Sequence, residues 1–322
     1  MSGEDDLIAR YFKPLARAPG ALGLTDDAAF YAPPAGCDLV LTKDALVAGI
    51  HFFADDPPDL VAKKALRVNL SDLAAKGAKP AGFLLALALP QTVEAEWLAA
   101  FAAGLSDDID AFGCPLFGGD TVRTPGPVTI SVTAFGTVAQ GRMVRRAGAA
   151  PGDRVFVTGS IGDAALGLRV KRGLAAPADD AAYLSGRYLL PQPRNALAAT
   201  LAAHASAAMD VSDGLAGDLA KLCAASAVSA HIQAAAVPLS APARSLLRAD
   251  PALLETVLTG GDDYEIVLTV APAAVAALQA AADAAGVAVT QIGEIVASDA
   301  PPRFVDDAGV PLRLTRLSFS HF

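Results

Sequence analysis

Short apolar segments of strand length alternate with longer segments of helical periodicity along most of this 322-residue chain. Residues 38–43 and 83–89 are typical of strands, and residues 58–76 form a helical pattern that ends at Gly77. A segment rich in β-branched residues follows at 127–138. A chain that alternates in this way must cover its sheets with its own helices, so the sequence predicts an α/β fold.

A break in the pattern near residue 145 predicts two domains. The segment RRAGAAPGD at 145–153 is made of Gly, Pro, small and charged residues, and a new strand, RVFVTG, begins at its end. The chain is also longer than a single hydrophobic core usually requires. We therefore expect an N-terminal domain over 1–145 and a C-terminal domain over 146–322. The second contains helices near 163–172, 194–204 and 273–285 and a strand over 264–270.

Charge and composition exclude several classes of protein. A net charge of −9 argues against a nucleic-acid partner, because phosphate backbones are bound by clustered Lys and Arg. The apolar run at 83–89 is far shorter than the roughly 20 residues that cross a bilayer, so no membrane span is expected. The N-terminus, MSGEDD, lacks the basic and apolar character of a secretory signal, and the three cysteines have no CxxC spacing. These features indicate a cytoplasmic protein.

Aspartates in five segments stand where local structure does not require them. The segments are TDDAA (Asp26, Asp27), TKDAL (Asp44), NLSDLAA (Asp72), FGGDTVR (Asp120) and MDVSDGLAGDLAK (Asp210, Asp213, Asp218). On a helix, Asp72 shares a face with Val68, Ala65 and Ala75, and a buried carboxylate must be protonated, hydrogen-bonded or bound to a metal. We expect Asp44 and Asp120 at the C-terminal ends of strands, where open α/β sheets present ligand-binding groups.

For each acid taken alone, a structural role is the better interpretation, but the set as a whole favours metal binding. Ser212 or Asp213 can cap the helix that begins near Gly214, for example. Oxygen ligands without His or Cys favour Mg²⁺, which takes one or two protein carboxylates together with substrate phosphates. The set therefore predicts more than one Mg²⁺ ion and a phosphate-rich ligand.

Glycine-rich and basic segments agree with a phosphate ligand but are less specific. Gly118 and Gly119 precede Asp120, and TGSIGD at 158–163 places a turn between a strand and a helix, where backbone N–H groups can bind an anion; both can equally be tight turns. Arg145 and Arg146 either bind a phosphate or form a solvated pair, and His51 is either structural or ligand-binding. The chain contains neither GxxxxGK[ST] nor GxGxxG.

The ordered series of motifs resembles the thiamine-monophosphate kinase family over essentially the full chain. The series is TDDAA, TKDALVAGIHF, NLSDLAAKGAKP, GGDT, RRAGAAPGD, VTGSIGDAALGL, DVSDGL, GGDDYE and a terminal HF. The resemblance implies two α/β domains with mixed (α+β) sheets, of the aminoimidazole ribonucleotide synthetase-like type. It further implies that the N-terminal domain binds ATP and metal and forms a homodimer through its sheet, and that the C-terminal domain completes the active site.

The implied reaction is the phosphorylation of thiamine monophosphate by ATP, giving thiamine diphosphate, with several Mg²⁺ ions as cofactors. By resemblance, the metal-binding positions are Asp27, Thr42, Asp44, Asp72, Asp120, Asp210 and Asp213. The ATP-binding positions are Gly119, Asp120, Arg146 and Ser212, and the substrate-binding positions are His51, Asp262 and Phe319. Asp72, Asp120, Arg146 and Asp210 are expected to carry catalysis.

The sequence departs from the family pattern at three positions. Thr25 stands where the family's motif begins with Gly, Lys43 where a Thr often precedes the metal-binding Asp, and Asp262 where the family has Glu. Lys43 either weakens one metal site or replaces part of its charge.

Two other functions are alternatives to the kinase reaction. They are another ATP-dependent enzyme of the superfamily, similar to aminoimidazole ribonucleotide synthetase, and a non-catalytic regulatory dimer that binds MgATP. Because no nucleophile with a partner base is found, we expect direct in-line transfer.

Overall fold

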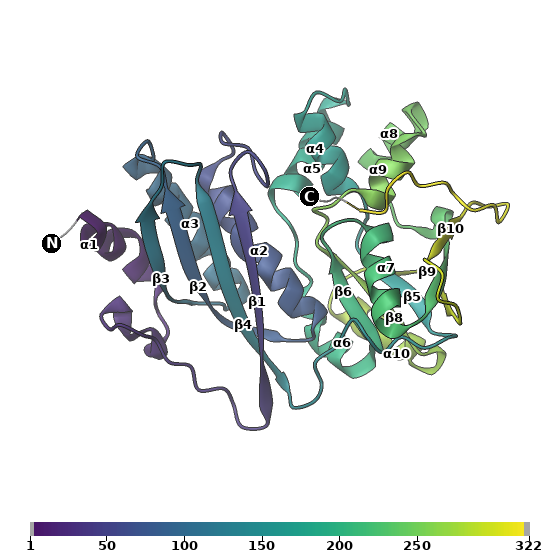
Figure 1. Cartoon of the computed structure of the whole chain (residues 1–322), viewed down its shortest axis with the longest axis horizontal. Coiled ribbons are helices and arrows are strands. Elements are labelled where there is room, and N and C mark those ends of the chain that lie inside the picture. The colour runs from purple at the N-terminus through teal and green to yellow at the C-terminus, as the bar shows by residue number, and fades with distance from the viewer. Residues whose placement is uncertain (1–2, 319–322) are drawn as a thin grey trace. The chain divides into compact units, whose positions relative to one another are not determined.

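A computed structural model describes residues 3–318 of the chain, which divide into two compact units (Figure 1). Over these residues, unit 1 comprises 3–73 and Ala78–Gly141, and unit 2 comprises Ala74–Gly77 and 142–318. Each unit is built on its own sheet. No helix among the described residues is both long enough and apolar enough to span a membrane.

Unit 1 is built on a four-stranded mixed sheet with the strand order β1-β4-β2-β3. Its strands are β1 (Cys37–Val47), β2 (Lys79–Leu89), β3 (Leu116–Arg123) and β4 (Thr129–Ala139). β4 pairs antiparallel with β1 and β2, and β3 pairs parallel with β2. The expectation that Asp44 and Asp120 end their strands is wrong. Both lie within paired strands, because Asp44 is in register with Val132 and Asp120 with Ala86.

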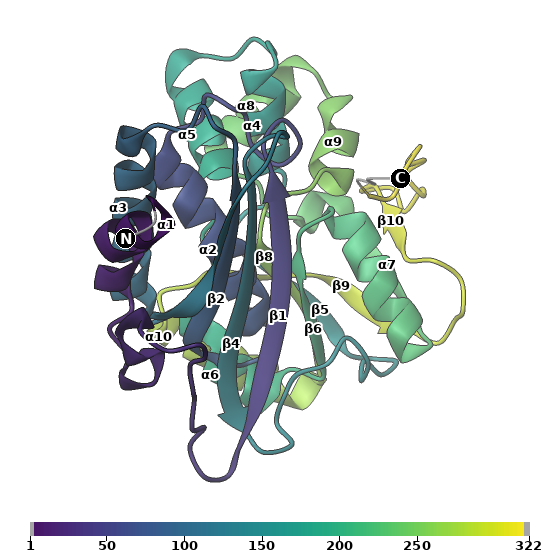
Figure 2. The same ribbon diagram turned by 60° about the vertical axis from the view of Figure 1, so that its left-hand side comes forward.

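Two long helices cover one face of this sheet (Figures 1 and 2). They are α2 (Pro58–Ala75) and α3 (Ala95–Phe112), and Arg67 on α2 donates two hydrogen bonds, of 2.7 and 2.8 Å, to Asp108 on α3. The N-terminal segment is helical but broken, since Pro14 cannot continue a helix. Its turns are α1 (Gly3–Leu7), the π-helical turn η1 (Ile8–Phe12), and the 3₁₀ turns η2 (Lys13–Leu15) and η3 (Pro19–Leu24).

The other face of the unit 1 sheet exposes apolar side chains. Successive residues of a strand point to opposite faces, and the strand register places Leu39, Leu41, Leu84 and Val122 on the face away from α2 and α3. These four side chains are 43%, 64%, 43% and 49% exposed. We call this surface the open face. Lys43 and Asp120 lie on it as well, because they alternate with Thr42, Asp44 and Gly119.

Unit 2 is built on a six-stranded mixed sheet with the order β10-β7-β9-β5-β8-β6. The pair β10 and β7 is parallel and the other pairs are antiparallel. The strands are β5 (Arg154–Thr158), β6 (Ala207–Val211), β7 (Ser229–Gln233), β8 (Glu265–Val270), β9 (Val289–Val296) and β10 (Arg303–Val305).

Helices cover both faces of the unit 2 sheet and form two apolar cores. Leu201 and Leu278 pack with Phe156 on one face, and Leu166 and Leu219 pack with Val157 on the other. The first face is covered by α6 (Ala198–His204) and α10 (Val275–Ala284). The second is covered by α4 (Asp163–Lys171), α5 (Ala178–Leu189), α7 (Leu215–Ser226), α8 (Ala241–Ala249) and α9 (Leu253–Thr259). Short 3₁₀ turns are η4 (Asn195–Leu197), η5 (Ala234–Ala236) and η6 (Pro272–Ala274).

Candidate functional site

Two of the expected metal-binding aspartates of unit 1 lie close together. Thr42 and Asp44 share one face of β1, and the Thr42 hydroxyl donates a hydrogen bond to the Asp72 carboxylate on α2. The side chains of Val68, Ala65 and Ala75 around Asp72 are buried, as the helical pattern predicts. Burial raises the pKa of Asp44 to about 6, and the nearby charge of Asp72 adds to the rise. We call Asp44 and Asp72 the carboxylate pair.

The carboxylate pair has the chemistry of a site for a hard cation. Among the described residues, no Lys, Arg or His side chain forms an ion pair with either acid. Lys43 lies on the open face and donates to the Ser131 hydroxyl (2.8 Å), so it does not compensate the pair within its own chain. Over residues 3–318, no three His, Cys, Asp or Glu side chains converge on a metal position. An ion here needs further oxygens from water or phosphate, as Mg²⁺ does.

A cavity of about 500 Å³ lies beside β3 in unit 1 and brings three other expected residues together. Asp27, Gly119 and Asp120 line it, together with an apolar wall that includes Ile8 and Phe12. A Cβ atom on Gly119 would lie 1.8 Å from the Leu85 carbonyl oxygen, so only glycine fits at this position. The cavity thus combines carboxylates and exposed backbone with an apolar surface.

The sheet keeps Asp120 away from the carboxylate pair of the same chain. Asp44, Val132, Leu85 and Gly119 form one row across the four strands, so Gly119 is three strand spacings, about 15 Å, from Asp44. Asp120 is the next residue and points to the opposite face. One chain therefore cannot place Asp44 and Asp120 on the same ion.

His51 has a defined tautomer in this unit. Its Nδ1 accepts a hydrogen bond from the Val47 N–H (2.9 Å), and Lys64 donates to its carbonyl oxygen (3.1 Å). The neutral imidazole therefore carries its proton on Nε2. The half-buried ring can donate from Nε2 to an anionic oxygen.

In unit 2, the motifs DVSDGL and GGDDYE meet as two adjacent turns. The N–H of Asp262 donates to the Ser212 carbonyl and that of Tyr264 to the Val211 carbonyl, both at 2.9 Å. A Cβ atom on Gly261 would lie 2.3 Å from the Ser212 carbonyl oxygen, so this approach requires glycine. The structure thereby brings the segment with Asp210, Ser212 and Asp213 beside Asp262.

Asp218, rather than Ser212 or Asp213, satisfies the start of α7. Its carboxylate accepts the N–H groups of Asp213 (2.9 Å) and Gly214 (3.2 Å), and no side chain caps the helix at Gly214. The Asp213 carboxylate itself pairs with Lys221 (2.6 Å), so a metal ion at Asp213 would have to displace that ammonium group. The capping interpretation of Ser212 and Asp213 is wrong, while Asp210 is a buried acid one residue before the end of β6.

The last two expected residues are Arg146 and Phe319. Arg146 is exposed on a loop whose backbone accepts a hydrogen bond from the Ser226 hydroxyl (3.1 Å), and the preceding Arg145 carbonyl accepts the Ala208 N–H at the start of β6. Phe319 lies outside the described residues.

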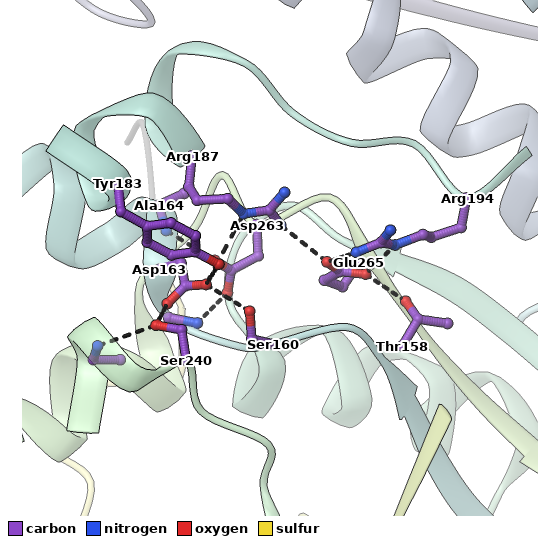
Figure 3. Close-up of polar contacts among 12 residues, drawn as sticks. Thr158, Ser160, Asp163, Ala164, Tyr183, Arg187, Arg194, Ser240, Asp263 and Glu265 are labelled. Carbon is purple, nitrogen blue, oxygen red and sulfur yellow. Dashed lines mark hydrogen bonds and ion pairs between the residues drawn. The ribbon is translucent and has the colours of Figure 1, made fainter. Parts of the chain in front are cut away.

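A buried polar cluster behind the GGDDYE turn escaped the sequence analysis (Figure 3). Glu265 is fully buried and accepts hydrogen bonds from Arg187 (2.9 Å), from Nε of Arg194 (2.6 Å) and from the Thr158 hydroxyl (2.6 Å). Asp263 accepts the N–H groups of Gly162 (2.6 Å) and Ala164 (3.1 Å) at the start of α4. Burial raises the pKa of Asp263 well above its usual range, and these two hydrogen bonds oppose the rise.

The cluster holds a strained turn. Asp262 and Tyr264 have φ angles of +73° and +50°, in the left-handed region that non-glycine residues rarely adopt. Asp263 and Glu265 alternate with them and point inward to α4 and to the two arginines. The pattern that could have indicated this is the run of four polar residues, DDYE, entering an otherwise apolar strand, because inward-pointing acids in a core need buried partners.

Comparisons with known proteins identify the family. The AIR synthase related protein, N-terminal domain, matches residues 25–138, and the corresponding C-terminal domain matches residues 150–305. A thiamine-monophosphate kinase of Caulobacter vibrioides is 46% identical over 297 residues, covering 91% of this chain and 84% of that protein. The chain belongs to the thiamine-monophosphate kinase family. This finding confirms the expected family and the expected class of enzyme, a phosphotransferase. It also confirms the expected fold of two α/β domains with mixed sheets.

Solved structures of thiamine-monophosphate kinases agree with this assignment. One from Stenotrophomonas maltophilia superposes with a TM-score of 0.83 at 39% identity, covering 96% of both chains. A structure of AaThiL complexed with AMPPCP and TMP superposes with a TM-score of 0.77 at 29% identity, covering 92% of this chain and 91% of that one.

The buried cluster leads to a prediction for Asp263→Asn. An amide oxygen can replace one carboxylate acceptor, but the amide nitrogen cannot accept the second N–H, so we expect a loss of stability of about 1–3 kcal/mol. The turn at 260–264 should also relax, and its amides should exchange hydrogen faster in mass spectrometry. Asp153→Asn is the matched control, because Asp153 is also buried and accepts hydrogen bonds from the Ala150 N–H and the Ser206 hydroxyl. Unchanged protection of the turn in Asp263→Asn would contradict the anchoring role.

Proposed function

We propose that this protein transfers the γ-phosphoryl group of ATP directly to thiamine monophosphate, producing ADP and thiamine diphosphate. The observation that carries the proposal is the carboxylate pair, which has no basic partner among the described residues. The resemblance to the family assigns both of its positions to magnesium. The solved relative complexed with AMPPCP and TMP supports the choice of substrates.

The residues fit a reaction whose main obstacle is electrostatic. The acceptor is an ionised phosphate oxygen, so no general base is required, and two polyanions must be brought together. Bound Mg²⁺ ions would neutralise part of this repulsion and orient the phosphates. The carboxylate pair, Thr42, Asp27, Asp120, Asp210 and Asp213 would hold these ions.

The remaining proposed residues bind and orient the two substrates. Gly119, Asp120, Arg146 and Ser212 would contact ATP, with the guanidinium of Arg146 opposing the phosphate charge. His51, Asp262 and Phe319 would contact thiamine monophosphate, and the Nε2–H of His51 suits a phosphate oxygen. Burial raises the pKa values of Cys114 and Cys223 to about 12, so neither thiol is ionised at neutral pH. Transfer without a covalent intermediate is consistent with these states.

The proposal assigns different tasks to the two domains. Residues 1–145 would bind ATP and metal and residues 146–322 would complete the site, since the expected residues fall in both domains.

The three cysteines are free, which fits the reducing cytoplasm.

Phosphorus NMR of the purified protein with MgATP and a panel of phosphorylated acceptors tests the function. We expect thiamine diphosphate and ADP to form together, with inversion at a chiral γ-phosphorus. ADP formed only with the substrate of aminoimidazole ribonucleotide synthetase would favour that enzyme's reaction instead. ATP binding without turnover of any acceptor would favour a regulatory dimer, and retention of configuration would contradict direct transfer.

A magnesium titration tests the carboxylate pair. Asp72→Asn keeps the size of the side chain and removes its charge, so we expect kcat to fall by roughly two to three orders of magnitude, the scale for loss of one electrostatic group. The concentration of Mg²⁺ for half-maximal activity should rise, because mass action refills a weakened site. Asp107→Asn removes an exposed charge of α3 and is the control. Equal Mg²⁺ requirements in the two variants would remove Asp72 from the metal site.

We also propose that two copies associate through the open face. Its exposed Leu39, Leu41, Leu84 and Val122 form an apolar surface in a unit whose other face is already covered by helices. A second copy buries the same residues on both partners, which is how a two-fold dimer is built. Asp120, on the same face, would then lie at the interface.

Light scattering at micromolar concentration tests this association. The unaltered protein should have twice the mass of one chain, and Leu41→Glu should shift it toward the monomer, since a charge would be buried in the interface. Val310→Glu introduces the same charge at an exposed apolar residue of unit 2 and should leave the mass unchanged. A monomeric unaltered protein, or a dimeric Leu41→Glu variant, would contradict the proposed interface.

A further inference from the structure

Gly217 is buried on α7, although the same face is exposed further along the helix. Residues four and seven positions further along the same face, Lys221 and Ala224, are both exposed. The burial of Gly217 comes from the end of the described chain. A Cβ atom on Gly217 would lie 2.4 Å from the Cβ of Ser318 and 2.9 Å from the carbonyl oxygen of Leu317.

The chain reaches Gly217 along a path with several anchors. We call residues 311–318 the C-terminal tail. Leu312 and Leu314 pack against the apolar core of unit 2, and the Leu312 N–H donates to the Phe304 carbonyl (2.8 Å). Thr315 donates from both its N–H and its hydroxyl to the Glu255 carboxylate on α9. The tail, yellow in Figure 1, therefore contacts α9 at Glu255 and α7 at Gly217.

Both of these helices adjoin the two turns of the candidate site. α7 begins directly after the turn of Ser212, Asp213 and Gly214, and α9 ends at Thr259, directly before Gly260, where the GGDD turn begins. Gly217 is three residues beyond Gly214, which is about 4.5 Å along the helix axis. The last described residue of the tail, Ser318, thus lies against Gly217, which follows Asp213 by about one helical turn.

We propose that Gly217 is a positioning residue that seats the C-terminal tail beside the Ser212–Gly214 turn and thereby completes the thiamine-monophosphate site. The proposal rests on the proposed function. Alanine is the better helix former at this position, but its methyl group would occupy space that the tail uses. A side chain at 217 must therefore displace the tail, a change that the helix itself would not oppose.

Two glycine-to-alanine variants separate this role from a general effect on helices. Gly186 in α5 is exposed, and a Cβ atom there meets nothing within 4 Å, so Gly186→Ala is the matched control for Gly217→Ala. Gly186→Ala should leave the KM for both substrates unchanged. Gly217→Ala should raise the KM for thiamine monophosphate by at least about tenfold and change the KM for ATP by less than about twofold.

Limited digestion with trypsin gives a readout that does not depend on activity. Arg313 and Arg316 lie in the tail, so a displaced tail should be cleaved faster in Gly217→Ala than in Gly186→Ala. Thr315→Ala, which removes one of the two bonds to Glu255, should change cleavage and KM in the same directions. If Gly217 acts through the tail, a Gly217→Ala, Phe319→Ala double variant should bind thiamine monophosphate no more weakly than Phe319→Ala alone.

Three results of these experiments would contradict the role of Gly217. Unchanged cleavage in Gly217→Ala would show that Gly217 does not hold the tail, and faster cleavage with an unchanged KM would show that the tail lies outside the substrate site. Equal increases in both KM values would indicate a general distortion and also overturn the proposal. Failure of the proposed function is distinguished by an unaltered protein that does not phosphorylate thiamine monophosphate at all.

Discussion

The burial of Glu265 is the constraint on which much of unit 2 depends. A carboxylate fully removed from water is costly unless opposite charges and hydrogen-bond donors surround it, and here Arg187, Arg194 and the Thr158 hydroxyl do so. These partners come from α5, from the segment after it and from β5, so one buried charge joins parts of the chain far apart in sequence. The same interaction fixes the end of the GGDDYE turn, where left-handed Asp262 and Tyr264 could otherwise relax.

Electrostatics has the opposite character in unit 1, where like charges are brought together. Asp72 lies on a small apolar face of α2 and Asp44 on the neighbouring strand, and the hydroxyl of Thr42 joins β1 to α2 by donating to Asp72. Lys43, one of the three departures from the family pattern, is adjacent to Asp44 in sequence but lies on the other face of the sheet. Strand alternation therefore answers a question that sequence leaves open: within one chain, Lys43 does not supply charge to the carboxylate pair.

The sequence predicted features that depend on local periodicity. The α/β alternation, the long helix α2 and the apolar surroundings of Asp72 follow from spacing alone, and the family follows from the order of the motifs. Features that depend on distant partners were missed. The sequence around Arg187 and Arg194 does not indicate that both bind Glu265. Gly217 looks like an ordinary glycine of an alanine-rich helix, and only the structure shows that Ser318 packs against it. The ends of β1 and β3 were misplaced because pairing with β4 and β2 continues the strands past their polar residues.

The ion pair between Asp213 and Lys221 gives any cation binding at Asp213 the character of an exchange. A divalent ion arriving there replaces an ammonium group that already neutralises the carboxylate, and the lysine can return when the ion leaves. The lysine and aspartate side chains are 42% and 37% exposed, so the pair contributes at most about 1 kcal/mol and is easily opened. Because Lys221 also pairs with the buried Asp218 (2.9 Å), its ammonium group stays near Asp213 and can neutralise that carboxylate again when the ion leaves.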